Sequence, residues 1–308
     1  MIGEFELIKK LTAILEDNSI GDDTAYINID NKVSLNITCD AFLEDVHFLR
    51  RYPPESIGFK SISINVSDIV ANGGKPLYSL ISLMIPDDID ERFIERIYEG
   101  VKSASLFYNL KIVGGNISKS SKLGIDVFLI GEVDRFVSRA GANVGDDVVV
   151  SGTLGDSYAG FKLLTSKKQY EEYELRLIER HLRPTARIDY INHIRKYASA
   201  SMDISDGLSS DLWHIAERSN VVIDIDLNKI PISRELRLYA SKENLNPYDL
   251  ALSGGEDYQL LFCQKKEHFN PFLDNTVIGQ VVEKGKALVL VNGKELERTG
   301  FDHFKNRQ

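Results

Sequence analysis

The sequence predicts a two-domain α/β (α+β) protein. Its 308 residues are 43% hydrophobic and 27% charged, which is typical of a soluble globular chain with room for two hydrophobic cores. Before residue 134, short strand patterns interrupted by helical patterns indicate an α+β domain with mostly antiparallel strands. The stretch 135–145 then has few large aliphatic residues and several Gly and Ala residues. We therefore expect one domain over residues 1–137 and a second over residues 138–308.

The first domain is expected to begin with an amphipathic helix within residues 1–18. Alternation and helical spacing predict strands at 26–29, 33–40, 79–85 and 125–133, and helices at 55–72 and 91–109. The second of these strands would end on Asp40. The pair Gly114-Gly115 follows a short strand and is interpreted as a turn whose backbone amides could approach a phosphate.

The second domain is expected to open with a strand and then three helices. The ranges are 146–151 for the strand and 155–168, 172–182 and 186–198 for the helices. A strand, a tight turn and a helix ending near Ser219 follow at the motif around Asp203. Beyond it we expect a strand at 221–227, a helix at 233–244, a strand ending at Cys263, and a hairpin at Asn292-Gly293.

Composition excludes several classes of protein. The net charge of −9 and the pI near 5.3 argue against nucleic acid as a partner. Two cysteines, Cys39 and Cys263, are too few for a disulfide framework or a cysteine zinc site. No apolar run approaches the roughly 20 residues that span a bilayer, and the acidic N-terminal segment does not resemble a signal peptide. We expect a cytoplasmic protein with no membrane partner.

The most informative stretch is residues 202–208, Met-Asp-Ile-Ser-Asp-Gly-Leu. Its strand–turn–helix pattern holds Asp203 and Asp206 beside a helix N-terminus. Carboxylates at this place commonly cap the first N–H groups of the helix. They can also share a hard cation such as Mg²⁺, with backbone amides left for phosphate oxygens. For this turn alone capping is the favoured interpretation, because capping is so common.

Other acidic turns favour the cation. Asp22-Asp23 and Glu256-Asp257 accompany glycine turns, and Asp40 is expected at a strand end. Asp68 shares a helix face with two asparagines and no cation. Without clustered histidine or cysteine, such oxygen ligands suit Mg²⁺ or Mn²⁺ holding a polyphosphate, with an arginine to stabilise a transferring phosphoryl group. The chain has no P-loop, protein-kinase motif or nucleophile elbow.

Nine motifs in order resemble those of the thiamine-monophosphate kinase family, within the aminoimidazole ribonucleotide synthetase superfamily. They include IGDDTA (20–25), NVSDIVANGG (65–74), VGGNIS (113–118), GTLGDS (152–157), RHLRPTAR (180–187), MDISDGL (202–208) and GGEDYQLLF (254–262). The resemblance implies a two-domain PurM-like fold, with an N-terminal domain forming a dimeric β-barrel and a C-terminal α+β domain. It also implies a homodimer that transfers the γ-phosphoryl group of ATP directly and in line to thiamine monophosphate, with several Mg²⁺ ions.

The resemblance also assigns roles to individual residues. Asp203, Asp206 and Arg139 are the implied catalytic residues. The implied metal ligands are Asp23, Thr38, Cys39, Asp40, Asp68, Asn116, Asp203 and Asp206. The implied ATP contacts are Tyr98, Gly115, Asn116, Arg139 and Ser205, and the implied acceptor contacts are His47, Glu256 and Phe301. Two positions depart from the family pattern: Cys39 could offer only its backbone carbonyl as a hard ligand, and Asn116 replaces an aspartate.

Two alternatives stay open. Another ATP-dependent synthetase of the superfamily, such as aminoimidazole ribonucleotide synthetase, would use the same ATP site with a different acceptor. From a different class, the chain could be a non-catalytic metal-binding dimer whose acidic turns are structural. Turnover of ATP with a defined acceptor distinguishes these alternatives.

Overall fold

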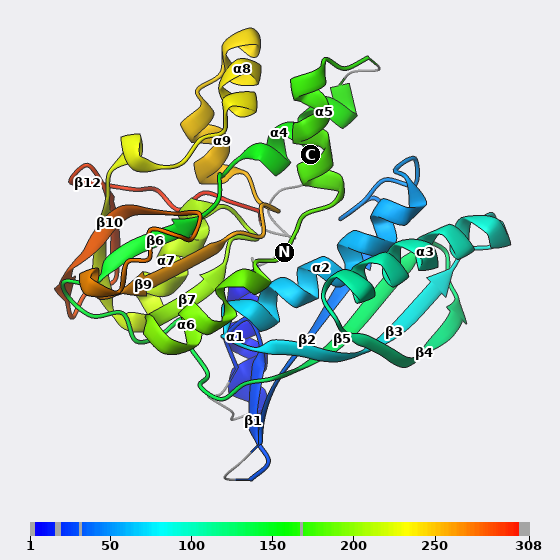
Figure 1. The fold of residues 1–308 in the computed structure, drawn as a ribbon, viewed down its shortest axis with the longest axis horizontal. Helices are drawn as coiled ribbons and strands as arrows, with labels where there is room; N and C mark the ends of the chain where they lie inside the picture. Colours follow the sequence, from blue (N-terminus) through cyan, green and yellow to red (C-terminus); the bar gives the residue numbers. More distant parts are fainter. Residues whose placement is uncertain (1–3, 16–19, 31–32, 167–168, 302–308) are drawn as a thin grey trace.

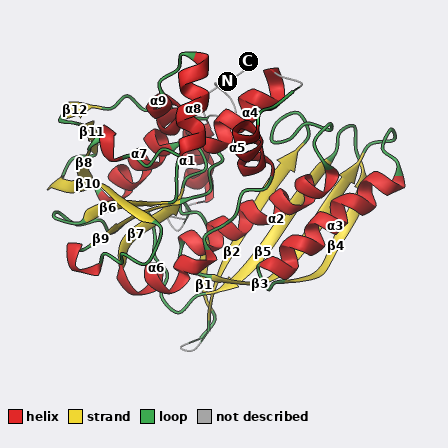
Figure 2. Ribbon diagram, turned by 45° about the horizontal axis from the view of Figure 1, so that its top comes forward, coloured by secondary structure: helices red, strands yellow, loops and turns green. Residues whose placement is uncertain are grey.

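The computed structural model describes residues 4–15, 20–30, 33–166 and 169–301, which form two lobes, each built on one mixed β-sheet (Figure 1). The N-terminal sheet has the strand order β1-β2-β5-β3-β4, and α2 and α3 cover one of its faces (Figure 2). Its elements are α1 (Glu4–Leu15), β1 (Ala25–Asn28), β2 (Ser34–Leu43), α2 (Pro54–Ala71), β3 (Lys75–Ile85), α3 (Glu91–Phe107), β4 (Lys111–Lys119) and β5 (Gly124–Glu132).

The C-terminal sheet has the order β12-β11-β8-β10-β6-β9-β7, and α7 packs against β7 and β8. Its strands are β6 (Asp147–Ser151), β7 (Ala198–Asp203), β8 (Val221–Ile225), β9 (Leu260–Gln264), β10 (Asn275–Lys284), β11 (Leu288–Val291) and β12 (Lys294–Glu295). Its helices are α4 (Asp156–Ser166), α5 (Glu172–Leu182), α6 (Ile191–Tyr197), α7 (Leu208–Ser219), α8 (Arg234–Glu243) and α9 (Pro247–Ser253).

The N-terminal sheet is open in the part of the chain that the structure describes. All of its pairings are antiparallel except β3 with β4, as predicted, and β1 and β4 form its two edges. The barrel expected for this domain is therefore not closed within one chain. On the face away from α2 and α3, Leu80, Phe128 and Cys39 are exposed and form a cross-strand row.

Two strand predictions were wrong in ways that matter for the site. The strand expected to end on Asp40 continues as β2 to Leu43, so Asp40 lies inside the sheet opposite Val127. Gly114 and Gly115 lie within β4 and do not form a turn. A Cβ atom on Gly115 would lie 1.9 Å from the carbonyl oxygen of Ile81, so glycine permits the close approach of β4 to β3.

The helix predictions differ from the structure mainly at their ends. The helix expected at 186–198 is a 3₁₀ turn, Ile188–Tyr190, followed by α6, and α9 was not predicted at all. The helix after Asp203 begins at Leu208, because Gly207 has a φ of 111° and holds a turn open before it. The hairpin at Asn292-Gly293 is confirmed by the pairing of β11 with β12. Among the described residues, no helix is both long and apolar enough to cross a bilayer.

Glycines let α2 and α3 pack with their backbones almost in contact. A Cβ atom on Gly58 would lie 1.9 Å from the carbonyl oxygen of Ile97, and one on Gly100 would lie 1.9 Å from that of Glu55. Neither oxygen can move without distorting its helix. The close approach holds α2, which carries Asp68, firmly on the sheet.

We predict that Gly100→Ala lowers the free energy of unfolding by about 1 to 3 kcal/mol, because the added methyl group overpacks the crossing. Glycine to alanine in an exposed helix normally has the opposite sign, stabilising by roughly 1 kcal/mol. Denaturant unfolding measures the effect, with Lys102→Ala on the exposed face of α3 as the control. A Gly100→Ala protein as stable as the wild type would contradict the assigned crossing.

Candidate active site

Three of the carboxylates expected to bind metal meet where the two lobes join. Asp23 lies in the loop before β1, Asp68 lies in the last turn of α2, and Asp203 is the last residue of β7. Each offers an oxygen atom, and these oxygens all lie within 4.8 Å of one another. An all-oxygen set at this spacing is what Mg²⁺ prefers in proteins.

Two hydroxyl groups orient this cluster, which we call the Asp23–Asp68–Asp203 cluster. Thr38 lies in β2, and its Oγ1 donates to Asp68 Oδ2 at a distance of 2.6 Å. Ser67 Oγ donates to Asp203 Oδ2 at 2.6 Å, and this bond joins α2 of one lobe to β7 of the other. Thr38 was predicted at the site, whereas Ser67 was missed because a serine in a helix carries no distinguishing signal.

Arg139 closes the cluster from the segment between the sheets. Its Nη2 atom donates to Asp23 Oδ1 at 2.5 Å, and its backbone N–H donates to Asp22 Oδ1 at 2.7 Å. Among the described residues, Asp23 Oδ2 and Arg139 Nε are buried without a hydrogen-bond partner. Asp23 Oδ1 is thus paired with the Arg139 guanidinium, whereas Oδ2 has no partner among the described residues.

The cluster is electrostatically unfavourable as a set of bare anions. Burial, followed by the proximity of Asp23, raises the pKa of Asp203 to about 8. Burial also raises the pKa of Asp68 well above its usual range, and the nearby Asp40 and Asp203 add to the shift. A divalent cation would remove the repulsion that produces these shifts.

A second group of ligand atoms, from Asp206, Asp211 and His214, also lies within 4.8 Å of one another. Asp211 was not predicted. It is fully buried in α7, and both of its carboxylate oxygens lack a hydrogen-bond partner in the described part of the chain. A signal existed in the sequence, because Asp211 shares the buried face of α7 with Leu208 and Ile215 at helical spacing.

The C-terminal segment crosses the start of α7 and reaches the site. Arg298 Nη2 lies 2.8 Å from Nε2 of His214, which makes that nitrogen an acceptor. Farther along, the backbone N–H of Phe301 donates to the carbonyl oxygen of Asp206 at 3.1 Å. The ring of Phe301 is 40% exposed, so it can still contact a ligand beside the turn.

Glu256 reaches the same turn from the loop before β9. Its backbone N–H donates to the carbonyl oxygen of Ser205 at 2.8 Å. Its side chain points toward α2 and α5, with Lys60 Nζ 2.8 Å from Oε1 and His181 Nδ1 3.4 Å from Oε2. The structure therefore brings Ser205, Asp206, Glu256 and Phe301 together at this turn.

The neighbouring Asp257 has a structural role. Its carboxylate accepts the backbone N–H groups of Gly155 at 2.6 Å and Ser157 at 3.1 Å, and so caps the start of α4. These two hydrogen bonds join the motif at 152–157 to the motif at 254–262. They fix the loop that presents Glu256.

His47 lies in the turn after β2. Its Nδ1 atom accepts the backbone N–H of Leu43 at 3.0 Å, and its ring stacks on Phe42 at a centroid distance of 5.8 Å. The hydrogen-bond pattern assigns the proton of the neutral ring to Nε2. The imidazole is thus oriented as a donor.

The structure does not gather the remaining predicted residues at the cluster within one chain. The side chains of Cys39 and Asn116 lie on the open face of the sheet. Thr38, the neighbour of Cys39 in β2, points to the other face, where it contacts Asp68 of α2, because alternate residues of a strand point to opposite faces. Gly115 lies beside Asn116 on β4, and Tyr98 lies on α3. Both elements are on the side of their lobe away from the C-terminal lobe (Figure 1).

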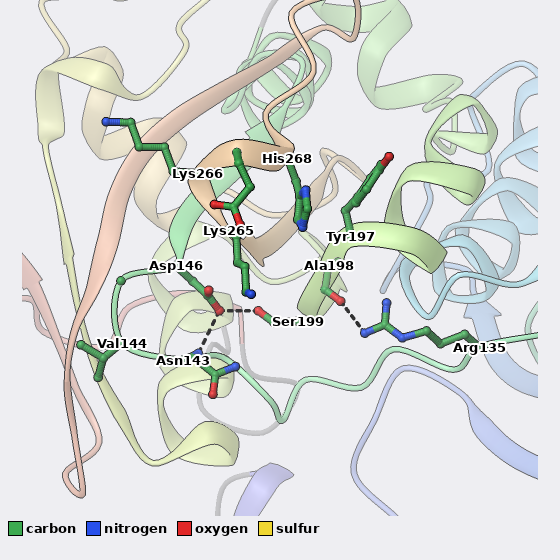
Figure 3. Close-up of a pocket in the computed structure, with 12 residues that line it drawn as sticks. Arg135, Asn143, Val144, Asp146, Tyr197, Ala198, Ser199, Lys265, Lys266 and His268 are labelled. Carbon is green, nitrogen blue, oxygen red and sulfur yellow. Dashed lines mark hydrogen bonds between the residues drawn. The ribbon is translucent and has the colours of Figure 1, made fainter.

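A pocket of about 460 Å³ lies elsewhere, at the opposite end of β7 from Asp203 (Figure 3). Several of its polar groups bond to one another. Ser199 Oγ and the backbone N–H of Asn143 both donate to Asp146 Oδ2, and Arg135 donates to the carbonyl oxygen of Ala198. These bonds account for Asp146, Ser199 and Arg135 as part of the fold.

The sequence matches family models over both lobes. Residues 21–133 match the AIR synthase related protein N-terminal domain, and residues 143–292 match the corresponding C-terminal domain. The chain is 57% identical to the thiamine-monophosphate kinase of Aquifex aeolicus over 98% of both chains. The chain belongs to the thiamine-monophosphate kinase family. The similar enzyme of Escherichia coli K12 is 34% identical, again over 98% of both chains.

Solved structures agree with this family assignment. One described as AaThiL complexed with AMPPCP and TMP has a TM-score of 0.95 at 56% identity, covering 98% of this chain and 97% of the other. The hydrogenase maturation protein HypE in complex with ATP has a TM-score of 0.72 at 19% identity, which shows a common fold. The predicted two-domain fold of the aminoimidazole ribonucleotide synthetase type is confirmed, and the chain is an enzyme of the thiamine-monophosphate kinase family.

The buried His181 predicts a pH dependence of stability. Burial, followed by the nearby Lys60 ammonium, lowers its pKa to about 3, against an ordinary value of about 6.5. Between these values the unfolded chain binds a proton that the folded chain does not. The free energy of unfolding should therefore fall by up to about 1.4 kcal/mol per pH unit as the pH drops below 6.5.

His181→Asn removes this titration, so the variant should lose less stability than the wild type between pH 6.5 and 5. Denaturant unfolding at several pH values measures the two slopes. Lys102→Ala, at an exposed position of α3 without an imidazole, serves as the control and should keep the wild-type slope. Parallel slopes for His181→Asn and the wild type would show that the imidazole does not stay neutral.

Proposed function

We propose that the chain transfers the γ-phosphoryl group of ATP to thiamine monophosphate and releases thiamine diphosphate and ADP. The observation that carries the proposal is the partly buried Asp23–Asp68–Asp203 cluster. It lies beside an arginine and the turn that contacts Glu256 and Phe301. The names of the similar kinases, and the AMPPCP and TMP in the related complex, support the same pair of substrates.

Mg²⁺ fits the donor set. The cluster offers only oxygen ligands, one of them without a partner among the described residues, and its carboxyl pKa values are raised by burial and mutual repulsion. We propose that Asp23, Asp68 and Asp203 hold Mg²⁺ together with Asp40, Asp206 and the backbone carbonyl of Cys39. Cations held there would neutralise the charge of four phosphate groups, three from ATP and one from the acceptor.

Thr38 and Ser67 keep the carboxylates oriented before substrates arrive. Asp22 holds the Arg139 backbone and Asp23 holds one end of its guanidinium. We propose that the remaining guanidinium N–H groups face a phosphate oxygen. We propose that Tyr98, Gly115, Asn116 and Ser205 contribute the remaining ATP contacts.

The transfer is proposed to be direct and in line. An oxygen of the acceptor phosphate attacks the γ-phosphorus of ATP, a P–O bond forms, and the bond to the β-phosphate oxygen breaks as ADP leaves. His47, Glu256 and Phe301 hold the acceptor for this attack. The chemistry then depends on positioning and charge, with no covalent enzyme intermediate.

We further propose that two copies close their open sheets into a shared barrel. The open face exposes Tyr78, Leu80, Phe128 and Leu43, a row of large apolar side chains that burial against a second copy would stabilise. The side chains of Asn116 and Cys39 lie on the same face of the sheet. Residues of both copies would then line the interface.

The direct test is ATP turnover with Mg²⁺, with and without thiamine monophosphate, and identification of the product by mass. We predict thiamine diphosphate only in the complete mixture. Asp203→Asn should lower kcat by about a thousandfold or more, since it removes several kcal/mol of charge stabilisation. The control is Asp87→Asn, whose side chain is 76% exposed and pairs with Lys119. ADP formed without thiamine diphosphate would indicate another superfamily acceptor, and metal binding without turnover would indicate a structural metal protein.

The role of Phe301 gives a second prediction. Phe301→Ala should raise the KM for thiamine monophosphate by about tenfold through loss of ring stacking, with little effect on the KM for ATP. Steady-state kinetics with each substrate varied in turn separates the two constants. Phe272→Ala is the control, because Phe272 is 94% exposed in the loop before β10. Equal changes in both KM values would exclude a specific acceptor contact.

A further inference from the structure

Glu256 is held by donors from both lobes. Lys60 Nζ in α2 lies 2.8 Å from Oε1, and His181 Nδ1 in α5 lies 3.4 Å from Oε2. Ser157 Oγ in α4 lies 3.2 Å from the same His181 nitrogen. Tyr52, just before α2, places its hydroxyl 3.3 Å from His181 Nε2. Both carboxylate oxygens of Glu256 are therefore contacted by groups that belong to different parts of the fold.

The direction of the Tyr52–His181 hydrogen bond follows from the protonation states of the two side chains. Tyr52 is buried and its pKa is raised by burial, so its phenol keeps its proton and donates to His181 Nε2. The neutral imidazole then carries its proton on Nδ1, facing Glu256. His181 thus links the Tyr52 hydroxyl of the N-terminal lobe to the Glu256 carboxylate, whose Oε2 lies 3.4 Å from Nδ1.

Two costs show that this arrangement is not ordinary packing. Lys60 is only 2% exposed, and a buried ammonium group is unfavourable unless it is paired. Glu256 has a φ of 65°, a left-handed conformation that a residue with a side chain seldom adopts. Strained backbone together with a buried ion pair commonly marks a functional position.

We infer that Lys60, His181 and Tyr52 are positioning residues that hold the Glu256 carboxylate against the cationic or amine-bearing end of the acceptor. This inference rests on the proposed function. Thiamine monophosphate carries a thiazolium cation and an aminopyrimidine, and either one suits a fixed carboxylate. The side chain of Glu256 is 29% exposed, so it still presents a surface to a ligand. Because Lys60 and Tyr52 belong to one lobe and Glu256 to the other, the lobes must be correctly docked for acceptor binding.

The test measures KM for thiamine monophosphate, KM for ATP and kcat in Lys60→Met and Tyr52→Phe. Loss of the Lys60–Glu256 ion pair predicts about a tenfold to hundredfold rise in the acceptor KM for Lys60→Met, and loss of the Tyr52 hydroxyl predicts a smaller rise for Tyr52→Phe. The KM for ATP and the kcat should stay within about twofold of the wild type. Lys102→Met, on the exposed face of α3, is the matched control.

Conservative rescue and a double-mutant cycle separate positioning from general stability. His181→Asn keeps an N–H donor near the Nδ1 position and should retain a lower acceptor KM than His181→Leu. In a Glu256→Gln background, Lys60→Met should add little, because its effect acts through Glu256.

Additive effects in the cycle, or equal changes in both KM values, would overturn the inference. Tyr52→Phe removes only a hydroxyl group, so it tests the network even if Lys60→Met does not fold. If the wild type makes no thiamine diphosphate, the proposed function fails first, which is a different result from an unchanged acceptor KM in active variants.

Discussion

The structure depends on placing several carboxylates close together in a partly buried site. Asp23, Asp68 and Asp203 come from a loop, a helix and a strand, and their oxygens approach within 4.8 Å. Without a cation, burial and mutual repulsion oppose their ionisation, as the raised pKa values of Asp68 and Asp203 indicate. The rest of the fold must hold them in place against that repulsion.

Each neighbouring feature contributes to this constraint. The glycine contacts between α2 and α3 fix the helix that carries Asp68, and the Ser67–Asp203 hydrogen bond joins the lobes beside the cluster. Gly207 opens the turn after β7. The backbone N–H groups of Glu256 and Phe301 can then donate to the carbonyl oxygens of the two preceding residues, Ser205 and Asp206. The same docking of the lobes creates the Lys60–Glu256 contact. Metal binding and acceptor binding are therefore built on one interface between the lobes.

The sequence predicted the elements with strong periodicity and the carboxylates at punctuated turns. Asp203 and Asp68 could be found because a turn motif and an unusually bare polar helix face are local patterns. Asp211 could also have been found, since a carboxylate on the apolar face of α7 is a local anomaly. By contrast, the orientation of Cys39 depends on strand parity and on which sheet face α2 covers. The Lys60–His181–Glu256 network joins residues 60, 181 and 256, and no local pattern encodes such a contact.

The most direct test of this account compares the thermal unfolding of the wild type and Asp68→Asn, each with and without Mg²⁺. The amide that replaces the carboxylate can still accept the hydrogen bond from Thr38. The substitution nevertheless removes one carboxylate charge from the cluster. Without metal, Asp68→Asn should be at least as stable as the wild type. Saturating Mg²⁺ should raise the Tm of the wild type by several degrees and that of the variant by much less, because ligand binding to the folded state alone is stabilising. A less stable variant with the full Mg²⁺ effect would contradict the central role of carboxylate repulsion.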